Sequence, residues 1–406
     1  MRGAVLGTVV VLFVSHVAAA QGAAKGTASS AGDDAPDATP EAEPESVPPE
    51  VDTTLGPAAD EPPPPITEPQ LTWKPYGFLR LQYRIVRNDP NVIFIGRDDG
   101  FELQNARIGV LGSLGTRVRY NVAIDGAVDE RQQINVPEGK LRVGLRDAYA
   151  DVAVSGSIAV RAGYFETLVD PDLDADIQRE FVDRPIESRG VRATEGYQTQ
   201  GLPPGRSLGA ALRLDPGRDP TGAAGPRIGF ELAVQNGADE YASNNDNDTP
   251  AASASVFVRL PKESWVVASA RFNRRTDGEL PFRRDEDDIE GSFGAKLNAG
   301  PVSVGAGVVF VRTMFPTTAS PVQNAFGAHG QLMVRAGVRL AVGYRFGILD
   351  PSSLFLTDRV IEHTVGAVLG VPALHMRLQV QVTHVQEQGA RDLTNDRAQI
   401  AAELAL

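Results

Sequence analysis

The sequence predicts an all-β protein, a transmembrane antiparallel β-barrel of about 16 strands that follows a disordered linker rich in proline, alanine and glutamate. Three observations predict this fold class. Apolar and polar residues alternate with a period of two from residue 74 onward, and the connections alternate between tight turns and long polar loops. The repeated two-faced pattern also leaves nothing from which a dry core could be built.

The segment 117–125 shows the alternation most clearly. Val118, Tyr120, Val122 and Ile124 alternate with arginine, asparagine and aspartate residues, so the strand has one apolar and one polar face. A soluble sandwich would show the same pattern, and this segment alone therefore does not define the environment. Its repetition along the chain favours a closed sheet with lipid outside and water inside, because closure removes the exposed edges.

Sixteen segments carry the alternation. They are expected at residues 79–85, 101–112, 117–125, 141–154, 158–164, 206–214, 228–235, 253–260, 265–273, 289–297, 302–310, 329–335, 338–346, 363–369, 374–382 and 399–406. An even number of strands of roughly 8 to 13 residues is typical of bacterial outer-membrane barrels.

The connections give a second, independent signal. Tight turns are expected at 112–116, 155–157, 261–263, 298–301, 335–337 and 370–372, and long polar loops at 87–100, 126–139, 166–205, 237–251, 274–287, 312–325, 348–359 and 386–396. Outer-membrane barrels place tight turns on the periplasmic side and long loops on the outer side. The connection 215–226 is longer than this pattern predicts. A soluble β-helix or a pair of sandwiches is the alternative, but neither predicts the alternation of connections.

Two regions precede the barrel. Residues 1–20 are a predicted signal peptide, with Arg2 as the positive start, an apolar run at 4–14 and small residues at 18–20 for cleavage. The apolar run is too short to cross a hydrocarbon core of roughly 30 Å as a helix. Residues 21–73 contain almost no large apolar side chains, so we expect a disordered, acidic, Pro-rich linker. Residues 74–406 form the predicted barrel domain.

The charge of the chain is distributed unevenly. Of its 52 acidic residues, 11 lie at positions 33–68, where there is no basic residue; residues 74–406 then hold 41 acidic and 37 basic residues, a net charge of −4. The barrel is close to neutral, and no basic patch indicates nucleic-acid binding. The chain has no cysteine, which excludes disulfides, thiolate metal sites and cysteine nucleophiles.

Several segments resemble the phosphate-selective porin O and P family of bacterial outer-membrane barrels. They are residues 100–110 (GFELQNARIGV), 115–125, 145–151 (LRDAYAD), 160–165 (VRAGYF), 181–185 (FVDRP), 203–209 and 234–237. The resemblance covers residues 77–406. It implies a sixteen-stranded homotrimeric channel with an arginine-lined lumen and inward-folded loops that form a constriction.

The chain departs from this family in two ways. It has only five lysines, whereas the anion-selective members concentrate lysines and arginines near the pore, so phosphate specificity is not carried over. It also ends in Leu406, where barrels of this type usually end in an aromatic residue. The alternation of the last strand is kept, so the barrel prediction stands.

Arginines at inward-facing positions are the candidate pore-lining residues, because rings of such charges attract anions and set selectivity. They are Arg80, Arg84, Arg107, Arg117, Arg119, Arg161, Arg259, Arg335, Arg339, Arg345 and Arg377. The alternative is that these arginines pair with lumen acids and stiffen the barrel. Periodicity does not place a residue along the height of the pore.

The long loop 166–205 is the candidate constriction, because a loop of this length in a compact domain is usually functional or disordered. Its candidate residues are Asp172, Asp176, Arg179, Asp183 and Arg184. If the loop folds inward, its acids enter the narrowest part of the pore and weaken an anion preference. A solvated external loop is the alternative.

The sequence therefore predicts a passive outer-membrane diffusion channel for small solutes, with an anion preference from lumen arginines and phosphate-like anions among its solutes. The linker is placed in the periplasm, and the partners are membrane lipid and small anions. The first alternative is a plugged barrel that acts as a structural anchor while the linker binds a periplasmic partner. The second is a barrel hydrolase, which a Ser/His or Asp/His pair in the lumen would support.

No enzyme, cofactor or metal site is predicted. The histidines outside the signal peptide, His329, His363, His375 and His384, are far apart in sequence, and none has the spacing of a metal ligand set or a catalytic triad.

Overall fold

The computed structural model describes residues 70–97, 99–126, 143–173, 179–196, 199–214, 228–237, 245, 247–277, 283–316, 322–388 and 392–406. The predicted signal peptide and all but the last four residues of the predicted linker lie outside these ranges. Within them, no helix is long and apolar enough to cross a membrane.

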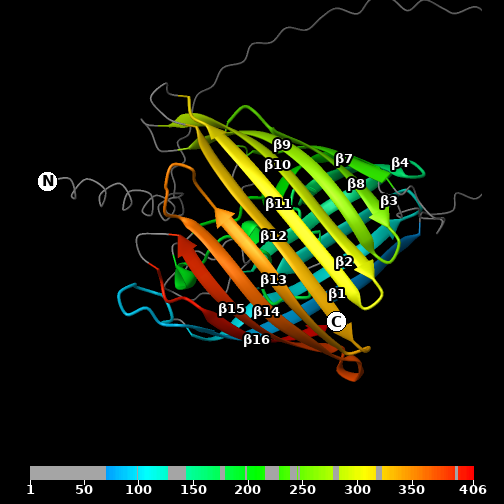
Figure 1. The fold of residues 1–406 in the computed structure, drawn as a ribbon. Coiled ribbons are helices and arrows are strands. Elements are labelled where there is room, and N and C mark those ends of the chain that lie inside the picture. Colours follow the sequence, from blue (N-terminus) through cyan, green and yellow to red (C-terminus); the bar gives the residue numbers. More distant parts are fainter. Residues whose placement is uncertain are drawn as a thin grey trace, which may run out of the picture. The chain divides into compact units, whose positions relative to one another are not determined.

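The described residues form sixteen strands that close into one antiparallel barrel (Figure 1). The strands are β1 (Leu71–Val86), β2 (Gly100–Leu114), β3 (Val118–Asp125), β4 (Gly144–Ser155), β5 (Ile158–Phe165), β6 (Ser207–Leu214), β7 (Ile228–Gln235), β8 (Ala251–Leu260), β9 (Ser264–Asp277), β10 (Arg284–Ala299), β11 (Val302–Met314), β12 (Gln323–Ala336), β13 (Leu340–Asp350), β14 (Arg359–Val371), β15 (Met376–Gln388) and β16 (Arg397–Ala405). Each strand pairs with its neighbour in sequence. β1 pairs with β16 in a register that runs from Phe78 opposite Ala405 to Val86 opposite Arg397. The predicted fold class is confirmed.

Several boundaries differ from the sequence-based expectation. β1 begins at Leu71, so residues 71–73, assigned above to the linker, belong to the barrel. Arg117 and Arg339 were expected on strands but lie in the turns before β3 and β13. Gly115 and Gly337 begin these turns with φ angles of 59° and 83°, which a glycine adopts without strain. The turns end at Arg117 and Arg339, one residue before the strands begin. Apolar alternation does not mark the start of β13, because Val338 in the turn keeps the period of two although it is 99% exposed.

The alternation sorts side chains between the two faces of the barrel wall. On β1, Leu79 and Leu81 point outward and are each 42% exposed, whereas Arg80 and Gln82 point inward and are fully buried. The same division holds along the other strands, where the exposed large hydrophobic residues face away from the barrel interior. An apolar outer face with a polar inner face is the arrangement of a barrel that spans a bilayer.

The inner face is not polar everywhere. Val309, Met333, Leu349 and Val360 sit at inward positions of neighbouring strands and are at most 1% exposed. A lumen filled only with water would leave these side chains wet. Leu349 and Val360 are buried because Ile186 and Val191, which belong to a distant segment of the chain, cover them from inside.

Candidate solute channel and its inner loop

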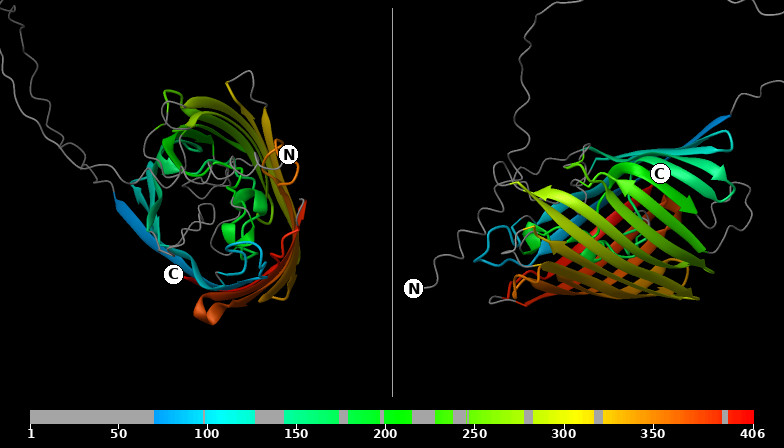
Figure 2. Two further views of the ribbon diagram at one scale, coloured as in Figure 1. Left: turned by 90° about the vertical axis from the view of Figure 1, so that its left-hand side faces the viewer. Right: turned by 90° about the horizontal axis from the view of Figure 1, so that it is seen from above.

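The segment that covers the inner wall is the loop 166–205 between β5 and β6, here called the inner loop. It includes the one-turn helix α2 (Ile186–Arg189) and the 3₁₀ helix η2 (Ala193–Glu195). In the view along the barrel in Figure 2 (left), α2 lies within the ring of strands. The choice that the sequence left open, between a folded-in and an external loop, is therefore decided for the described residues of the loop: they fold inward.

The start of the inner loop is bonded to one side of the wall. The Leu168 amide donates to the Glu231 carboxylate on β7 at 2.9 Å. Ser269 on β9 donates its hydroxyl to the Leu168 carbonyl at 2.6 Å, and Ser292 on β10 donates to the Val169 carbonyl at 2.5 Å. Two serines of the wall thus donate hydrogen bonds to loop carbonyl groups that would otherwise be buried without a hydrogen-bond partner.

The middle of the loop is bonded to the opposite side of the wall by glutamines. Gln379 on β15 donates to the Arg179 carbonyl at 2.8 Å, and Gln104 on β2 donates to the Val182 carbonyl at 3.1 Å. The Val182 amide donates to Gln381 at 3.0 Å. Amide side chains serve here because each can donate and accept, so they satisfy buried backbone groups without adding charge.

Asp183 is a fully buried acid of the loop. Its carboxylate accepts hydrogen bonds from Gln399 at 3.0 Å and Gln381 at 3.1 Å, and lies 3.5 Å from Arg397 and 3.6 Å from Arg192. Burial alone would favour the neutral acid. The two arginines and two amides instead stabilise the anion.

A second set of ion pairs joins the far end of the loop to β14 and β16. Arg189 lies 2.7 Å from Glu195 within the loop and 2.6 Å from Glu362 on β14. Arg397 on β16 lies 2.8 Å from the same Glu362, and Arg84 on β1 lies 3.3 Å from Glu195. All five side chains are almost completely buried, so each charge depends on its partners.

Two of the loop acids, Glu195 and Asp183, are therefore ionised at neutral pH. Burial raises the pKa of Glu195, but Arg189, Arg397 and Arg84 outweigh burial and lower the pKa to about 2. Burial also raises the pKa of Asp183, and Arg189 and Arg397 again hold it below its usual range. The pKa of the Arg189 guanidinium is raised well above its ordinary value, since the attraction of Glu195, Glu362 and Asp183 exceeds the effect of its burial.

These pKa shifts predict how the stability of the loop's attachment to the wall depends on pH. A carboxyl group with a lowered pKa contributes stability above its unfolded pKa of 4.5, and this contribution is lost as the pH falls toward about 2. We expect no step in the unitary conductance between pH 5 and pH 4, and a change near pH 2. Single-channel recording at the three pH values tests this. A transition between pH 4 and 5 would contradict the assignment of the lowered pKa values.

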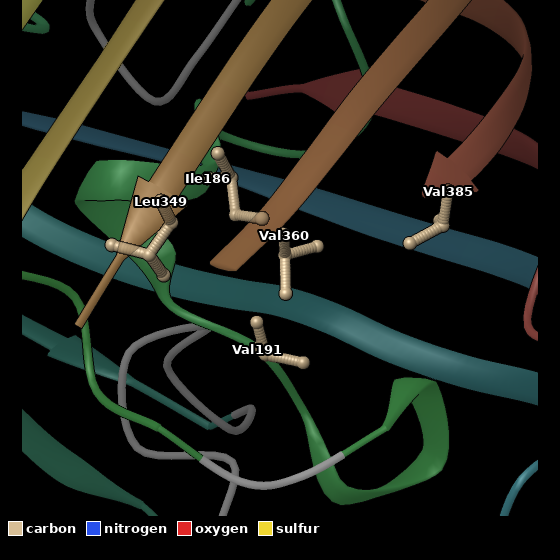
Figure 3. Close-up of a cluster of buried hydrophobic side chains, with 5 residues drawn as sticks. All are labelled: Ile186, Val191, Leu349, Val360 and Val385. Atoms are coloured by element: carbon tan, nitrogen blue, oxygen red, sulfur yellow. The ribbon is translucent and has the colours of Figure 1, made fainter. Parts of the chain in front are cut away.

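An apolar cluster completes the attachment (Figure 3). Ile186 and Val191 of the loop pack against Leu349 on β13, Val360 on β14 and Val385 on β15, and all five are at most 5% exposed. Burying side chains of this size contributes about 1.5–3 kcal/mol each. Apolar residues at inward positions are the sequence feature from which a covered wall could have been predicted.

Five of the predicted pore-lining arginines are buried in the interior. Their contacts are Arg80 with Glu403, Arg84 with Glu102 and Glu195, Arg107 with Asp125 at 3.2 Å, Arg161 with Asp151 at 2.7 Å, and Arg345 with the carbonyls of Asp183 and Arg184 at 2.9 and 3.2 Å. Four of the five face a carboxylate and the fifth holds the loop backbone. This is the arrangement expected if lumen arginines pair with lumen acids and stiffen the barrel, which was the alternative to a pore-lining role.

The other six predicted arginines lie at one end of the barrel. They are Arg117, Arg119, Arg259, Arg335, Arg339 and Arg377, and all belong to the tight turns or to the strand residues beside them. Arg335 is 4.0 Å from Glu180, with its side chain 53% exposed, and Arg377 is 3.4 Å from Glu403. We call this set the mouth arginines.

The constriction candidates are placed as follows. Arg184 lies 2.6 Å from Asp170 and 3.7 Å from Asp172, while Arg179 gives its carbonyl to Gln379. Asp176 lies outside the described residues. A small hollow between the loop and the wall is lined by Asp172, Arg179, Glu180, Phe181, Pro185, Gln331 and Arg345. The sequence reasoning did not single out Arg189, Arg192, Glu195, Glu362 or Arg397, whose roles depend on contacts between distant segments.

One histidine lies in the interior. His329 on β12 contacts the Glu187 carboxylate through Nδ1. The neighbouring Ser188 donates its hydroxyl to Asp170 at 2.8 Å, and so does not face the imidazole. His375 lies in the turn before β15 and is exposed. The His329–Glu187 pair joins the loop to the wall, and among the described residues no cluster of three or more His, Cys, Asp or Glu side chains could hold a metal ion.

Comparisons with known proteins support the fold. No protein-family model and no curated protein sequence matches the chain. Among solved structures, the barrel is similar to the outer-membrane channel DcaP of Acinetobacter baumannii (TM-score 0.58, 12% identity, 83% of this chain and 97% of that chain), and to the anion-selective porin from Comamonas acidovorans (0.56, 12%, 83% and 100%). It is also similar to OmpT of Vibrio cholerae in its trimer form (0.56, 11%, 83% and 99%). At these identities the likeness shows the fold alone, which is that of the outer-membrane porins.

Proposed function

We propose that this protein is a passive diffusion channel of the bacterial outer membrane for small solutes, with the linker in the periplasm. One observation carries the proposal: a closed barrel with an apolar outside and a charged inside holds a long loop firmly against part of its inner wall. A fixed inward loop narrows a water-filled barrel without closing it, which gives selection by size. The similarity to solved porins supports this reading.

The anion preference is assigned to the mouth arginines. The buried arginines face carboxylates, so their charges are largely balanced. Among the mouth arginines, Arg377 is also 3.4 Å from Glu403, and the basic rim on the side of the tight turns is assigned to Arg117, Arg335 and Arg339. A charged ring concentrates counter-ions at a pore entrance. Small anions, phosphate among them, are the solutes that this entrance favours, and no dedicated phosphate site is required.

The assembly is proposed to be a homotrimer, as the resemblance to the phosphate-selective porin family implies. A solved neighbour, OmpT of Vibrio cholerae, is described in a trimer form, which supports the proposal. Cross-linking of the detergent-solubilised protein should give a species of three chains. A species of one chain at all cross-linker concentrations would contradict it.

The channel function is tested by swelling of vesicles that contain the folded protein. We expect neutral sugars to enter at rates that fall steeply with their size, because the inner loop reduces the open cross-section. Absence of swelling with the smallest sugar would contradict the channel and favour the anchoring role. The His329–Glu187 pair does not support the hydrolase alternative, because the hydroxyl of Ser188 is bonded to Asp170 instead. The His384–Asp396 pair does not support it either, because its side chains are exposed.

The proposed role of the mouth arginines in anion selectivity can be tested by substitution. Replacing Arg117, Arg335 and Arg339 with glutamine should shift the reversal potential in a salt gradient toward cation preference, because the rim loses three positive charges. Arg87→Gln is the matched control, since its side chain is 69% exposed at the other end of the barrel. An equal shift in the control, or none in the triple variant, would contradict the assignment.

A further inference from the structure

A row of directly paired residues crosses the inner wall under the loop. In successive strands from β10 to β14, Gly294 is opposite Gly307, Gly307 opposite His329, His329 opposite Gly347, and Gly347 opposite Glu362. All five occupy positions on the inner face of the barrel, and we call them the wall row. Glycine is unfavourable in strand interiors, and where it occurs it often marks the close approach of another backbone.

The inner loop rests on the glycines of the wall row. A methyl group on Gly294 would overlap the carbonyl oxygen of Pro171. One on Gly307 would meet the His329 imidazole, which itself contacts the loop, at 2.5 Å and the Cβ atom of Pro171 at 3.1 Å. A methyl group on Gly347 would lie 3.0 Å from Cγ2 of Ile186. The loop therefore reaches the wall at a depth that a larger side chain would not allow.

The remaining members of the wall row bind the loop through charge. His329 contacts Glu187, and Glu362 lies 2.6 Å from Arg189. Two further inward glycines flank the row. A methyl group on Gly327 would overlap Cβ of Glu187, and one on Gly366 would lie 3.1 Å from the Phe181 ring. The loop thus packs against a strip of glycines on the inner wall that extends from β10 to β14.

We propose that the glycines at positions 294, 307, 327, 347 and 366 are positioning residues that set the width of the pore. They fix how deeply the inner loop is seated in the wall, and hence how much of the lumen remains open. This role rests on the proposed channel function, but the seating of the loop can be measured separately from conduction.

Alanine variants test the proposal with controls in the same strands. Gly294→Ala and Gly327→Ala should each push the loop toward the lumen and lower the unitary conductance by about 1.5-fold or more. Gly291→Ala on β10 and Gly330→Ala on β12 are the controls, because nothing lies within 4 Å of a methyl group at either position. A rise in conductance would show that the loop has left the wall, which also supports the positioning role. Equal conductance in all four variants and the native chain would overturn it.

A disulfide gives a readout that does not depend on the size of the current. The Cβ position built on Gly347 is 3.8 Å from Cβ of Ile186, which matches the separation in disulfides, and the native chain has no cysteine to interfere. In the Ile186→Cys, Gly347→Cys variant we expect the bond to form on oxidation, with the same unitary conductance before and after reduction. Failure of the bond to form in a folded barrel, or a conductance that changes on reduction, would overturn the proposal. If the native protein carries no current but the bond forms, the channel function fails and the seating of the loop stands.

Discussion

Removing residues 171–202 from the inner loop and joining its ends with a short Gly/Ser linker is expected to raise the unitary conductance at least about twofold. The loop occupies the barrel interior along the wall from β7 to β16, and its removal returns that volume to the lumen. The sixteen strands pair with one another without the loop, so the barrel should still fold. Planar-bilayer recording of the variant measures the effect.

A matched deletion controls for the loss of chain. Residues 354–356, in the connection between β13 and β14, have exposed side chains. Their removal should leave the conductance unchanged. If both deletions gave the native conductance, the inner loop would not be the constriction.

Arg397→Met is expected to destabilise the folded protein by about 3–5 kcal/mol, because three buried carboxylates each lose one of their positively charged partners. Arg397 is 2% exposed and lies 2.8 Å from Glu362, 3.5 Å from Asp183 and 3.7 Å from Glu195. The methionine fills much of the same space, so the loss of charge dominates. The shift of the denaturant midpoint, measured on protein folded in detergent, gives the result.

Arg359→Met is the matched control for that variant. Arg359 on β14 also makes an ion pair, 2.8 Å from Asp350, but its side chain is 44% exposed. Exposed pairs contribute at most about 1 kcal/mol, so only a small shift is expected. Equal shifts in the two variants would show that the buried cluster does not hold the loop.

The barrel itself was predictable because its determinants are local. Each strand carries its own two-residue alternation, as in β3, and each tight turn carries its own glycine or proline. Strand ends were less accurate, since the outer ends are polar on both faces. β9 continues to Asp277 through Arg274 and Arg275, where hydrophobic alternation has already stopped.

The candidate site was predictable only in part, because its contacts join distant segments. Asp183 was singled out within the loop, but its partner Arg397 lies on the last strand, and no periodicity relates the two positions. Likewise, Arg345 was expected as an inward charge, yet it donates to loop carbonyl groups whose position depends on the folded loop. The inward-facing Leu349, Val360 and Val385 were the sequence features from which a covered wall could have been inferred.

The contacts of the inward arginines also bear on the selectivity of the channel. Inward direction follows from strand periodicity, but the effective charge of an inward arginine depends on its partners. Arg107 and Arg161 each lie beside an aspartate on a neighbouring strand, and cross-strand register decides such pairs. Arg117, Arg335 and Arg339 of the rim lie in or beside tight turns, which is why the proposed anion preference moves from the constriction to the entrance.

Single-channel recording in a planar bilayer with a potassium chloride gradient, with and without phosphate, tests whether the barrel is an open, anion-selective channel. We expect a steady open conductance with a reversal potential on the anion-selective side, and only weak inhibition by phosphate. A cation-selective current would keep the channel and contradict the role of the mouth arginines. No conductance from well-folded protein would contradict the channel itself.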